Sequence, residues 1–343
     1  MKSLAVVLIL AFSSPAWSAD EKIKIDEEVK KSTSKGLEWL ASKQNTDGSW
    51  GDSSYPNNTA ITGFALMAFM SQGHVPNQGT YGKEVAKGAR FLMASQREDG
   101  YLVGSRGGNM YCHGMASLAL TQLWGMTGDD DIKKSVKKAI DLIVKSQCKD
   151  NSTNHGGWRY EPTPTGADIS VTIMQVMALR GAKDSGLNIP DEVMTRALSY
   201  INSCYDEGTG GYTYVPRNRS PGFARTAAGL CSLMLCGEYR DNIKDKRKAE
   251  QFDSSVAFLR KYMDNPREHY WYGHYYASHA FHQVGGKDWE AYYTMIKKKF
   301  LDMQMPDGSW SRRDYQSAGP VYQTSIAIIA LSVPANYLPI FQK

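Results

Sequence analysis

Two charged residues stand in otherwise apolar segments and could meet a ligand. Arg225 lies within "GFARTAAGLCSLMLCG" and Asp168 within "TGADISVT". Because a buried, unpaired guanidinium is costly, Arg225 should meet either a carboxylate or an anionic ligand. We favour Asp168 as its partner over a ligand. The Asp168 carboxylate itself is typical of a helix N-cap, with action as a proton donor as the alternative.

Histidines and cysteines form the next group of candidates. Cys112 and His113 are adjacent, so on a helix their side chains diverge by about 100° and are poorly placed to share a metal. His279 and His282 form an i, i+3 pair that could ligate a metal, but no HExxH motif accompanies them. We interpret these histidines as partly buried residues in an aromatic neighbourhood, and we expect no metal and no cofactor.

The chain contains five cysteines and no CxxC pair. Cys148 and Cys204 fall at nearly equivalent places in neighbouring repeats, so a disulfide between them remains an alternative to free thiols.

The beginning of the chain predicts export. Residues 1–18 combine Lys2, the apolar run "LAVVLILAF" and small residues at Ala16 and Ser18, which is typical of a secretory signal peptide cleaved near Ser18. We therefore expect a periplasmic or secreted protein, with residues 19–28 as an N-terminal tail. No later stretch is long enough and apolar enough to span a membrane. The formal net charge of +5 is mild and dispersed, which argues against nucleic-acid binding.

The elements that must position these side chains are repeated along the chain. Gln44, Gln96, Gln147 and Gln304 each end an amphipathic run, and their spacing is close to fifty residues or a multiple of it. Each is followed by a Gly-containing turn and an aromatic residue, as in "KQNTDGSW" and "MQMPDGSW". Two less regular copies complete a series of six.

Each copy predicts a helical hairpin. The first helix alternates charged and apolar residues, whereas the second, as in "VYQTSIAIIALSVP", is apolar on nearly all sides. The first should face solvent and the second should be buried. Because neither end of the series carries a polar cap, we expect closure and not an open solenoid. The sequence therefore predicts an all-α (α/α)6 toroid, formed by residues 29–343 as a single domain.

The repeated Gln, turn and aromatic residue have a structural interpretation. The Gln amide can satisfy a terminal carbonyl and the free N–H groups of the next helix. Glycine permits the positive φ that reverses the chain, and the aromatic ring packs across the joint.

A toroid collects the first turns of its inner helices at one end of the lumen. Besides Asp168, His113 and Arg225, which are our candidate catalytic residues, we expect the following ligand-binding residues at that mouth: Asn58, Tyr111, Tyr272, His274, Tyr275, Tyr322 and Gln323. This set suits a polar ligand, although aromatic faces would also stabilise a carbocation.

The repeated segments of Gln, turn and aromatic residue, such as "KQNTDGSW" and "MQMPDGSW", resemble the QW motif of squalene–hopene and oxidosqualene cyclases. The predicted toroid is similar to the one that those cyclases share with protein prenyltransferase β subunits. More narrowly, "GGWRYEP" and "GPVYQTSIAIIALSVPANYLPIF" resemble the exported prenyltransferase/squalene-oxidase-repeat proteins of bacteria, most of which have no assigned activity.

The catalytic signatures of the resembled enzymes are missing from this chain. The cyclases place a DxDD cluster at the start of an inner helix, where Asp168 is here the lone carboxylate. The Asp, Cys and His zinc set of the prenyltransferases is also absent. Other toroids include glycosidases with paired carboxylates and lyases with Tyr, His and Arg; the composition leaves the second kind open.

The sequence therefore favours a binding or scaffold protein whose lumen mouth recognises a small molecule, lipid or glycan, or a protein partner. The alternative is an enzyme of unassigned chemistry that acts on an isoprenoid or on a polysaccharide at the same mouth. Fold alone does not decide between them.

Overall fold

A computed structural model describes residues 23–342 except 53, 105–107, 219 and 313–317. The predicted signal peptide at 1–18 lies outside the described residues. The first helix begins at Glu27 after the N-cap Asp26, whose carboxylate accepts a hydrogen bond from the Val29 N–H at 3.0 Å. The predicted N-terminal tail therefore ends two residues earlier than expected.

Helices alternate between an outer and an inner position along the chain. The outer helices are α1 (Glu27–Ser42), α3 (Gly82–Ala94), α5 (Asp130–Ser146), α7 (Asp191–Ser203), α9 (Lys246–Tyr262) and α11 (Gly286–Met303). The inner helices are α2 (Thr59–Met70), α4 (Met110–Thr127), α6 (Ile169–Asp184), α8 (Phe223–Leu235), α10 (Tyr270–Val284) and α12 (Pro320–Ser332). The short elements are β1 (Tyr205–Asp206), β2 (Gly211–Tyr212), η1 (Arg240–Asn242), η2 (Val333–Ala335) and η3 (Pro339–Phe341).

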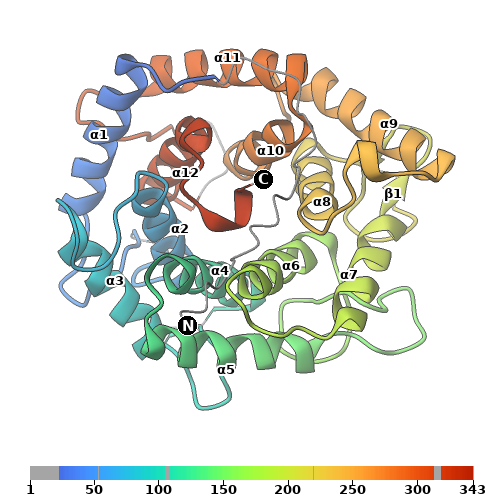
Figure 1. The fold of residues 1–343 in the computed structure, drawn as a ribbon, viewed down its shortest axis with the longest axis horizontal. Coiled ribbons are helices and arrows are strands. Elements are labelled where there is room, and N and C mark those ends of the chain that lie inside the picture. The colour runs from blue at the N-terminus through green and yellow to red at the C-terminus, as the bar shows by residue number, and fades with distance from the viewer. Residues whose placement is uncertain (1–22, 53, 105–107, 219, 313–317, 343) are drawn as a thin grey trace, which may run out of the picture.

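The inner helices form a closed ring. Each contacts the next in chain order, and α12 returns to α2, while the outer helices surround them (Figure 1). The predicted (α/α)6 toroid is confirmed.

The two kinds of helix differ as their sequences predict. In α5, Val136, Ile140 and Ile143 face inward and are buried, whereas the lysines of the opposite face are exposed. In α2, eleven of the twelve residues are buried. A helix that is apolar on every side gains most from burial between two layers.

The repeated glutamines join neighbouring hairpins. The amide nitrogen of each donates to the carbonyl of the glycine in its own turn and to a carbonyl in the next outer helix, all within 3.0 Å. The expected bond to the N–H groups of the next helix was wrong, because the amide oxygens of Gln96, Gln147 and Gln304 accept instead from side chains of the next outer helix: Ser135, Arg196 and Ser32. The indole N–H of Trp50, Trp158 and Trp310 donates to a carbonyl near the end of its own outer helix.

The turn glycines have the positive φ that the sequence predicts. Gly100 has a φ of 98°, and a Cβ atom there would lie 2.3 Å from the Lys138 carbonyl oxygen of the next outer helix. Equivalent contacts occur at Gly48, Gly156 and Gly308. Glycine is thus required both for the turn and for the close approach of two hairpins.

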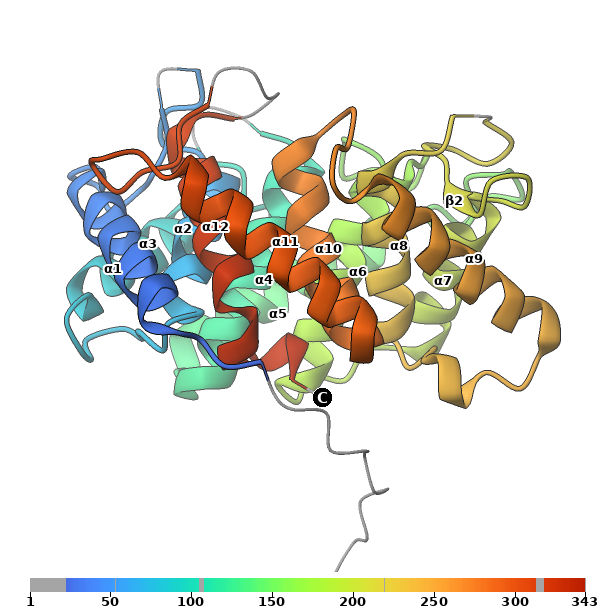
Figure 2. The ribbon, with the colours of Figure 1, turned by 90° about the horizontal axis from the view of Figure 1, so that it is seen from above.

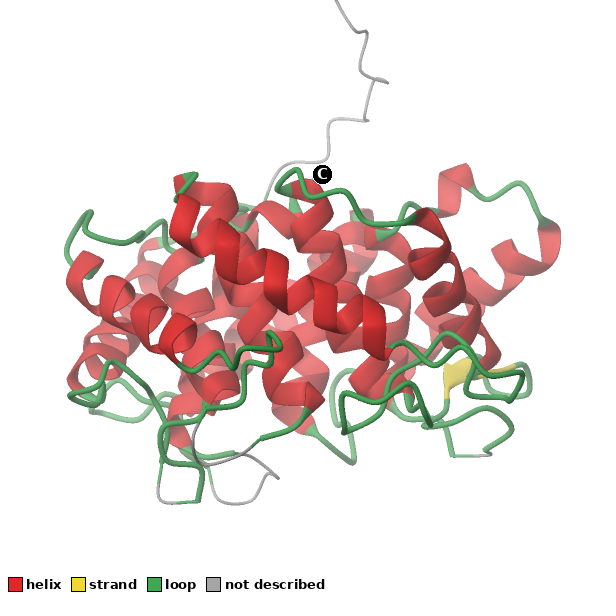
Figure 3. Cartoon of the chain, turned by 90° about the horizontal axis from the view of Figure 1, so that it is seen from below, coloured by secondary structure: helices red, strands yellow, loops and turns green. Residues whose placement is uncertain are grey.

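The loops from outer to inner helices lie at one end of the ring (Figure 3). At the other end, the C-terminal segment folds back beneath the lumen (Figures 1 and 2). There Gln122 accepts a hydrogen bond from the Ile340 N–H at 2.9 Å, and Gln283 donates to the Phe341 carbonyl at 3.0 Å. The Phe341 ring is buried and stacks on His279 at 3.3 Å between centroids. This segment closes the end of the lumen opposite the long loops.

Cys148 and Cys204 carry free thiols, so the alternative of a bridge between them is not found. No helix in the described parts of the chain has the length and apolar character needed to cross a bilayer.

Candidate functional site

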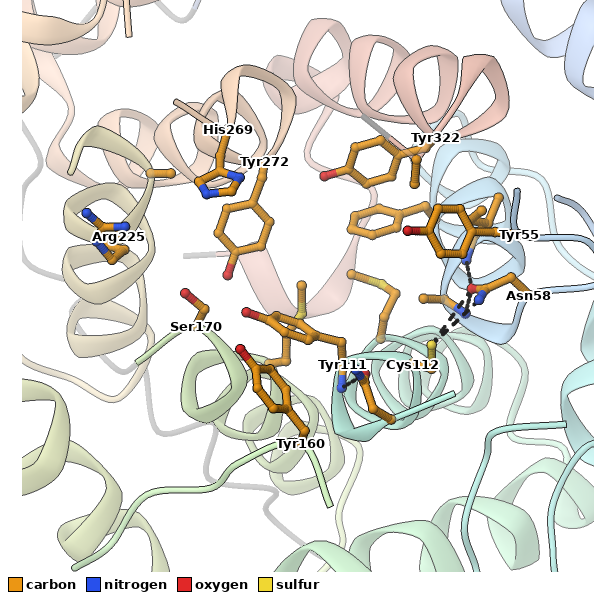
Figure 4. A pocket seen from close by; sticks show the side chains of 18 of the residues that line it. Tyr55, Asn58, Tyr111, Cys112, Tyr160, Ser170, Arg225, His269, Tyr272 and Tyr322 are labelled. Carbon is orange, nitrogen blue, oxygen red and sulfur yellow. Dashed lines mark hydrogen bonds between the residues drawn. The ribbon is translucent and has the colours of Figure 1, made fainter. Parts of the chain in front are cut away.

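A cavity of about 690 Å³ opens at the loop end of the lumen. Its walls come from the first turns of the inner helices and from the loops before them (Figure 4). Phe64, Met115 and Met174 provide apolar surface. A cavity of this size is typical of a site for a small molecule.

Six tyrosines line the cavity. Tyr111, Tyr272 and Tyr322 come from α4, α10 and α12, and the others are the loop residues Tyr55, Tyr160 and Tyr214. Burial raises the pKa of Tyr111 and Tyr322 above their usual range, and that of Tyr272 well above it. These phenols therefore keep their protons at neutral pH and act as hydrogen-bond donors and aromatic faces, not as phenolates.

Asn58 and Cys112 lie side by side on the wall. Asn58 caps α2, because its Oδ1 accepts from the N–H groups of Ala60 and Ile61 at 2.9 and 3.1 Å. Its Nδ2 lies 3.7 Å from the Cys112 Sγ. Both residues line the cavity, but the capping bonds already occupy the Asn58 oxygen.

Arg225 lines the cavity on the α8 side. Its Nη2 donates to the Ser220 carbonyl at 2.8 Å, and its Nη1 lies 4.0 Å from the Glu268 carboxylate. The predicted Arg225–Asp168 ion pair is therefore wrong. The partner is Glu268, in the loop before the next inner helix, and this exposed side chain approaches only to the outer limit of an ion pair.

Asp168 is fully buried and does not belong to the cavity lining. It caps α6, accepting from the Val171 N–H at 2.9 Å, as the N-cap interpretation expects. Loss of solvation raises its pKa, and this effect exceeds the opposing interactions with the Val171 N–H and the Tyr214 hydroxyl. The Tyr214 hydroxyl lies 2.5 Å from that of Tyr160, and both tyrosines line the cavity. The Asp168 Oδ2 is buried without a hydrogen-bond partner among the described residues.

His113 is a structural residue, away from the cavity. Its Nδ1 accepts from the Leu102 N–H at 3.1 Å, so Nε2 carries the proton and donates to the Ala139 carbonyl at 3.1 Å. It thereby ties its own turn and α4 to the outer helix α5. Burial lowers the pKa of His113 to about 4, so the ring is neutral at neutral pH.

Three other expected mouth residues also lie outside the cavity lining. His274 is buried, with Nδ1 3.0 Å from the Tyr292 hydroxyl of the outer helix α11. Gln323 accepts from the Arg312 N–H at 2.8 Å and donates to its carbonyl at 3.0 Å. Tyr275 is fully buried with its ring edge against Phe64.

Asn58, Tyr111, Arg225, Tyr272 and Tyr322 are thus the predicted residues that the structure brings together at one cavity. Sequence reasoning missed the lining residues Tyr55, Cys112, Tyr160, Ser170, Tyr214 and His269. A signal for two of them existed, since Tyr160 and Tyr214 each stand two residues after the repeated aromatic of their turn. No group of three His, Cys, Asp or Glu side chains suited to a metal occurs among the described residues.

No family model matches the chain. Two curated relatives match over short stretches. Lanosterol synthase of Mus musculus is 38% identical over 73 residues, which is 21% of this chain and 10% of the relative. Squalene–hopene cyclase of Bradyrhizobium diazoefficiens is 37% identical over 78 residues, 19% of this chain and 11% of the relative. The chain thus matches about a tenth of the length of these relatives.

Solved structures match over nearly the whole chain at low identity. An inactive variant of an alpha-1,6-mannanase of Salegentibacter sp., in complex with alpha-1,6-mannotriose, has a TM-score of 0.66 and 7% identity, covering 90% of this chain and 99% of that one. The type II terpene cyclase MstE of Scytonema has a TM-score of 0.61 and 12% identity, covering 91% and 99%. These similarities establish the toroid fold and leave the chemistry to the residues of the site.

Chemically, the described lining offers aromatic faces, phenol donors and the Arg225 guanidinium. Among its described lining residues, none is Asp or Glu. Hydrolysis by a pair of carboxylates that face the ligand therefore has no support from this lining.

Proposed function

We propose that the chain is an exported binding protein whose lumen holds a small, partly apolar molecule. The observation that carries the proposal is the tyrosine-rich cavity without a described carboxylate in its lining. Phenol rings present a broad apolar surface with a polar edge, which suits a ligand that has both characters. Solved structures of the same fold hold ligands, alpha-1,6-mannotriose in the mannanase and geranylgeranyl dihydroxybenzoate in the terpene cyclase, which agrees with a toroid that binds a molecule.

The test is a binding screen on the purified protein. Candidate ligands are polyprenyl alcohols, squalene dispersed in detergent, and mannose oligosaccharides, measured by thermal shift and then by calorimetry. A ligand of the cavity should bind less tightly to Tyr111→Ala and Tyr322→Ala. The control is Tyr337→Ala, because Tyr337 is exposed beside the C-terminal segment at the opposite end. Equal affinities for all three variants would remove the cavity as the binding site.

A second candidate function is catalysis, favoured by one specific observation. Burial raises the pKa of Asp168 by disfavouring its charged form, and its Oδ2 is buried without a hydrogen-bond partner among the described residues. A carboxyl group that keeps its proton could supply it to an isoprenoid alkene or to a glycosidic oxygen. If any ligand is consumed, and Asp168→Asn abolishes its consumption but preserves its binding, the protein is an enzyme and the binding-only proposal fails.

A further inference from the structure

Arg225 has fewer partners than a largely buried guanidinium requires. Its side chain is 14% exposed, and its Nε is buried without a hydrogen-bond partner. Nη2 has the Ser220 carbonyl, a neutral acceptor, and Nη1 has only the distant Glu268 carboxylate. Removing a charged guanidinium from water is costly without a close counter-charge. The Arg225 guanidinium is therefore suited to bind an anion.

The described residues that line the rest of the cavity supply no such anion. The lining residues that the structure describes include no Asp or Glu, and Asp168, which caps α6, is fully buried outside this lining. Figure 4 shows Arg225 and His269 on the same side of the cavity, with Tyr272 beside them. Phe64 comes from α2 and Met115 from α4, inner helices that are not neighbours of α8 in the ring.

The cavity thus has a cationic side and an apolar side. We infer that its ligand is an amphipathic anion whose carboxylate or phosphate group binds Arg225 while its hydrocarbon part packs among the tyrosines, Phe64 and the methionines. This inference rests on the proposed binding function and narrows it to one chemical class. A bidentate bond from the guanidinium fits both carboxylate and phosphate, so the two are separated by experiment.

The experiment uses four probes that share one chain and differ in the head group: dodecanoate, dodecyl phosphate, dodecanol and dodecyltrimethylammonium, each below its micellar concentration. Affinity is measured by calorimetry. The site of binding is read from alkylation of Cys112, which lines the cavity, with Cys236 as the internal reference because it lies outside the cavity lining. Inorganic phosphate alone tests whether the anion binds without a chain.

We expect one or both anionic probes to bind about tenfold more tightly than dodecanol, since a charge-assisted pair contributes roughly that much. Arg225→Gln should remove this preference, so that the anionic probes bind no more tightly than dodecanol, whereas Arg225→Lys should retain part of it. The matched control is Arg247→Gln, because Arg247 is exposed and pairs with Glu207 on the outer surface. Circular dichroism and thermal unfolding show that each variant is folded.

The outcomes separate the inference from the proposed function. If all four probes protect Cys112 equally, the cavity binds amphipathic molecules and the anion inference is wrong. If no probe protects Cys112 and none of the ligands in the binding screen acts at the cavity, the proposed function itself fails. A preference for anions that survives in Arg225→Gln would also overturn the inference, because another group would then hold the anion.

Discussion

Gln304, just after the last outer helix, donates its side-chain amide to the carbonyl oxygen of Ser32 in the first outer helix at 2.9 Å. The Ser32 hydroxyl donates back to the Gln304 Oε1 at 2.7 Å. Elsewhere this hydrogen bond from amide to carbonyl joins outer helices that follow each other along the chain. Here it joins the last outer helix to the first. The ring is thus closed by the same device that builds the joints at Gln44, Gln96 and Gln147.

We expect Gln304→Ala to lower the free energy of unfolding by about 1–3 kcal/mol, because it breaks several hydrogen bonds and leaves the Ser32 groups without their partner. Urea unfolding monitored by tryptophan fluorescence measures the change. Gln78→Ala is the control, since Gln78 is exposed in a loop. Equal stabilities of the two variants would mean that the joint contributes nothing to closure.

The turn glycines provide a second test. Gly100 and Gly237 share a φ of 98°, but a Cβ at Gly100 would lie 2.3 Å from the Lys138 carbonyl, whereas at Gly237 nothing lies within 4 Å. We expect Gly237→Ala to cost about 1–2 kcal/mol of stability from backbone conformation alone. Gly100→Ala should cost a further 1–3 kcal/mol or so, because two hairpins must move apart. The midpoint of thermal or urea unfolding measures the loss of stability in each variant. Equal losses in Gly100→Ala and Gly237→Ala would contradict a steric role for Gly100 at the joint between hairpins.

His113 makes the fold sensitive to acid. Its pKa falls from 6.5 to about 4 on folding because the ring is buried, so the unfolded chain binds the proton more tightly. Its contribution is fully present above the ordinary pKa and is lost as the pH falls from about 6.5 towards 4. The loss is of the order of 3 kcal/mol. Thermal unfolding between pH 7 and pH 4 measures it.

A threonine is the natural replacement for His113. Thr62, Thr172 and Thr226 accept the equivalent N–H bond in other repeats. His113→Thr should lower stability at pH 7, because the smaller side chain loses the Ala139 bond and leaves space, yet it should show a weaker dependence on acid. The exposed His155→Gln should leave the pH profile unchanged. An unaltered profile in His113→Thr would assign the acid sensitivity to other groups, such as His274.

Asp168 should have the opposite effect on the pH profile. Burial raises its pKa, so the folded protein holds the proton more tightly than the unfolded chain, and stability falls as the pH rises above the ordinary carboxyl value. Asp168→Asn keeps the capping oxygen and removes the charge. We therefore expect it to be more stable than the parent at pH 7 and to lose that advantage below pH 4.

The matched variant for Asp168 is Asp168→Ala, which removes the charge and the cap together. It should be less stable than Asp168→Asn by about 1 kcal/mol, the usual contribution of a capping side chain. Thermal unfolding at pH 7 compares the two. If Asp168→Asn is destabilised as much as Asp168→Ala, the ionised carboxylate is itself stabilising and its burial is compensated by partners.

The fold was predictable because the same physical requirement appears in every repeat. Gln96 and Gln304 end outer helices, and Gly100 and Gly308 turn the chain, at a spacing that the sequence shows directly. The inner helices were predictable because their sequences are mostly apolar and carry few charged residues. Closure into a ring followed from the missing polar caps.

The candidate site was predictable only in part, because one step along a helix turns the side chain by about 100°. Tyr111, two residues after the N-cap Asn109, faces the cavity, whereas His113, four residues after it, faces the joint between hairpins. The sequence places the first turn to within a few residues, which is too coarse to separate the two. Glu268, the actual partner of Arg225, lies in a loop, where no periodicity points to it.

The C-terminal segment has one more consequence. Ile340 and Phe341 are buried beneath the lumen and bonded to Gln122 and Gln283. The C-terminal segment therefore covers one end of the lumen, and the cavity opens at the other. An occupant must leave by the route through which it entered, past the rings of Tyr55 and Tyr160. The residence time of a ligand therefore depends on how readily the Tyr55 and Tyr160 side chains move aside at this opening.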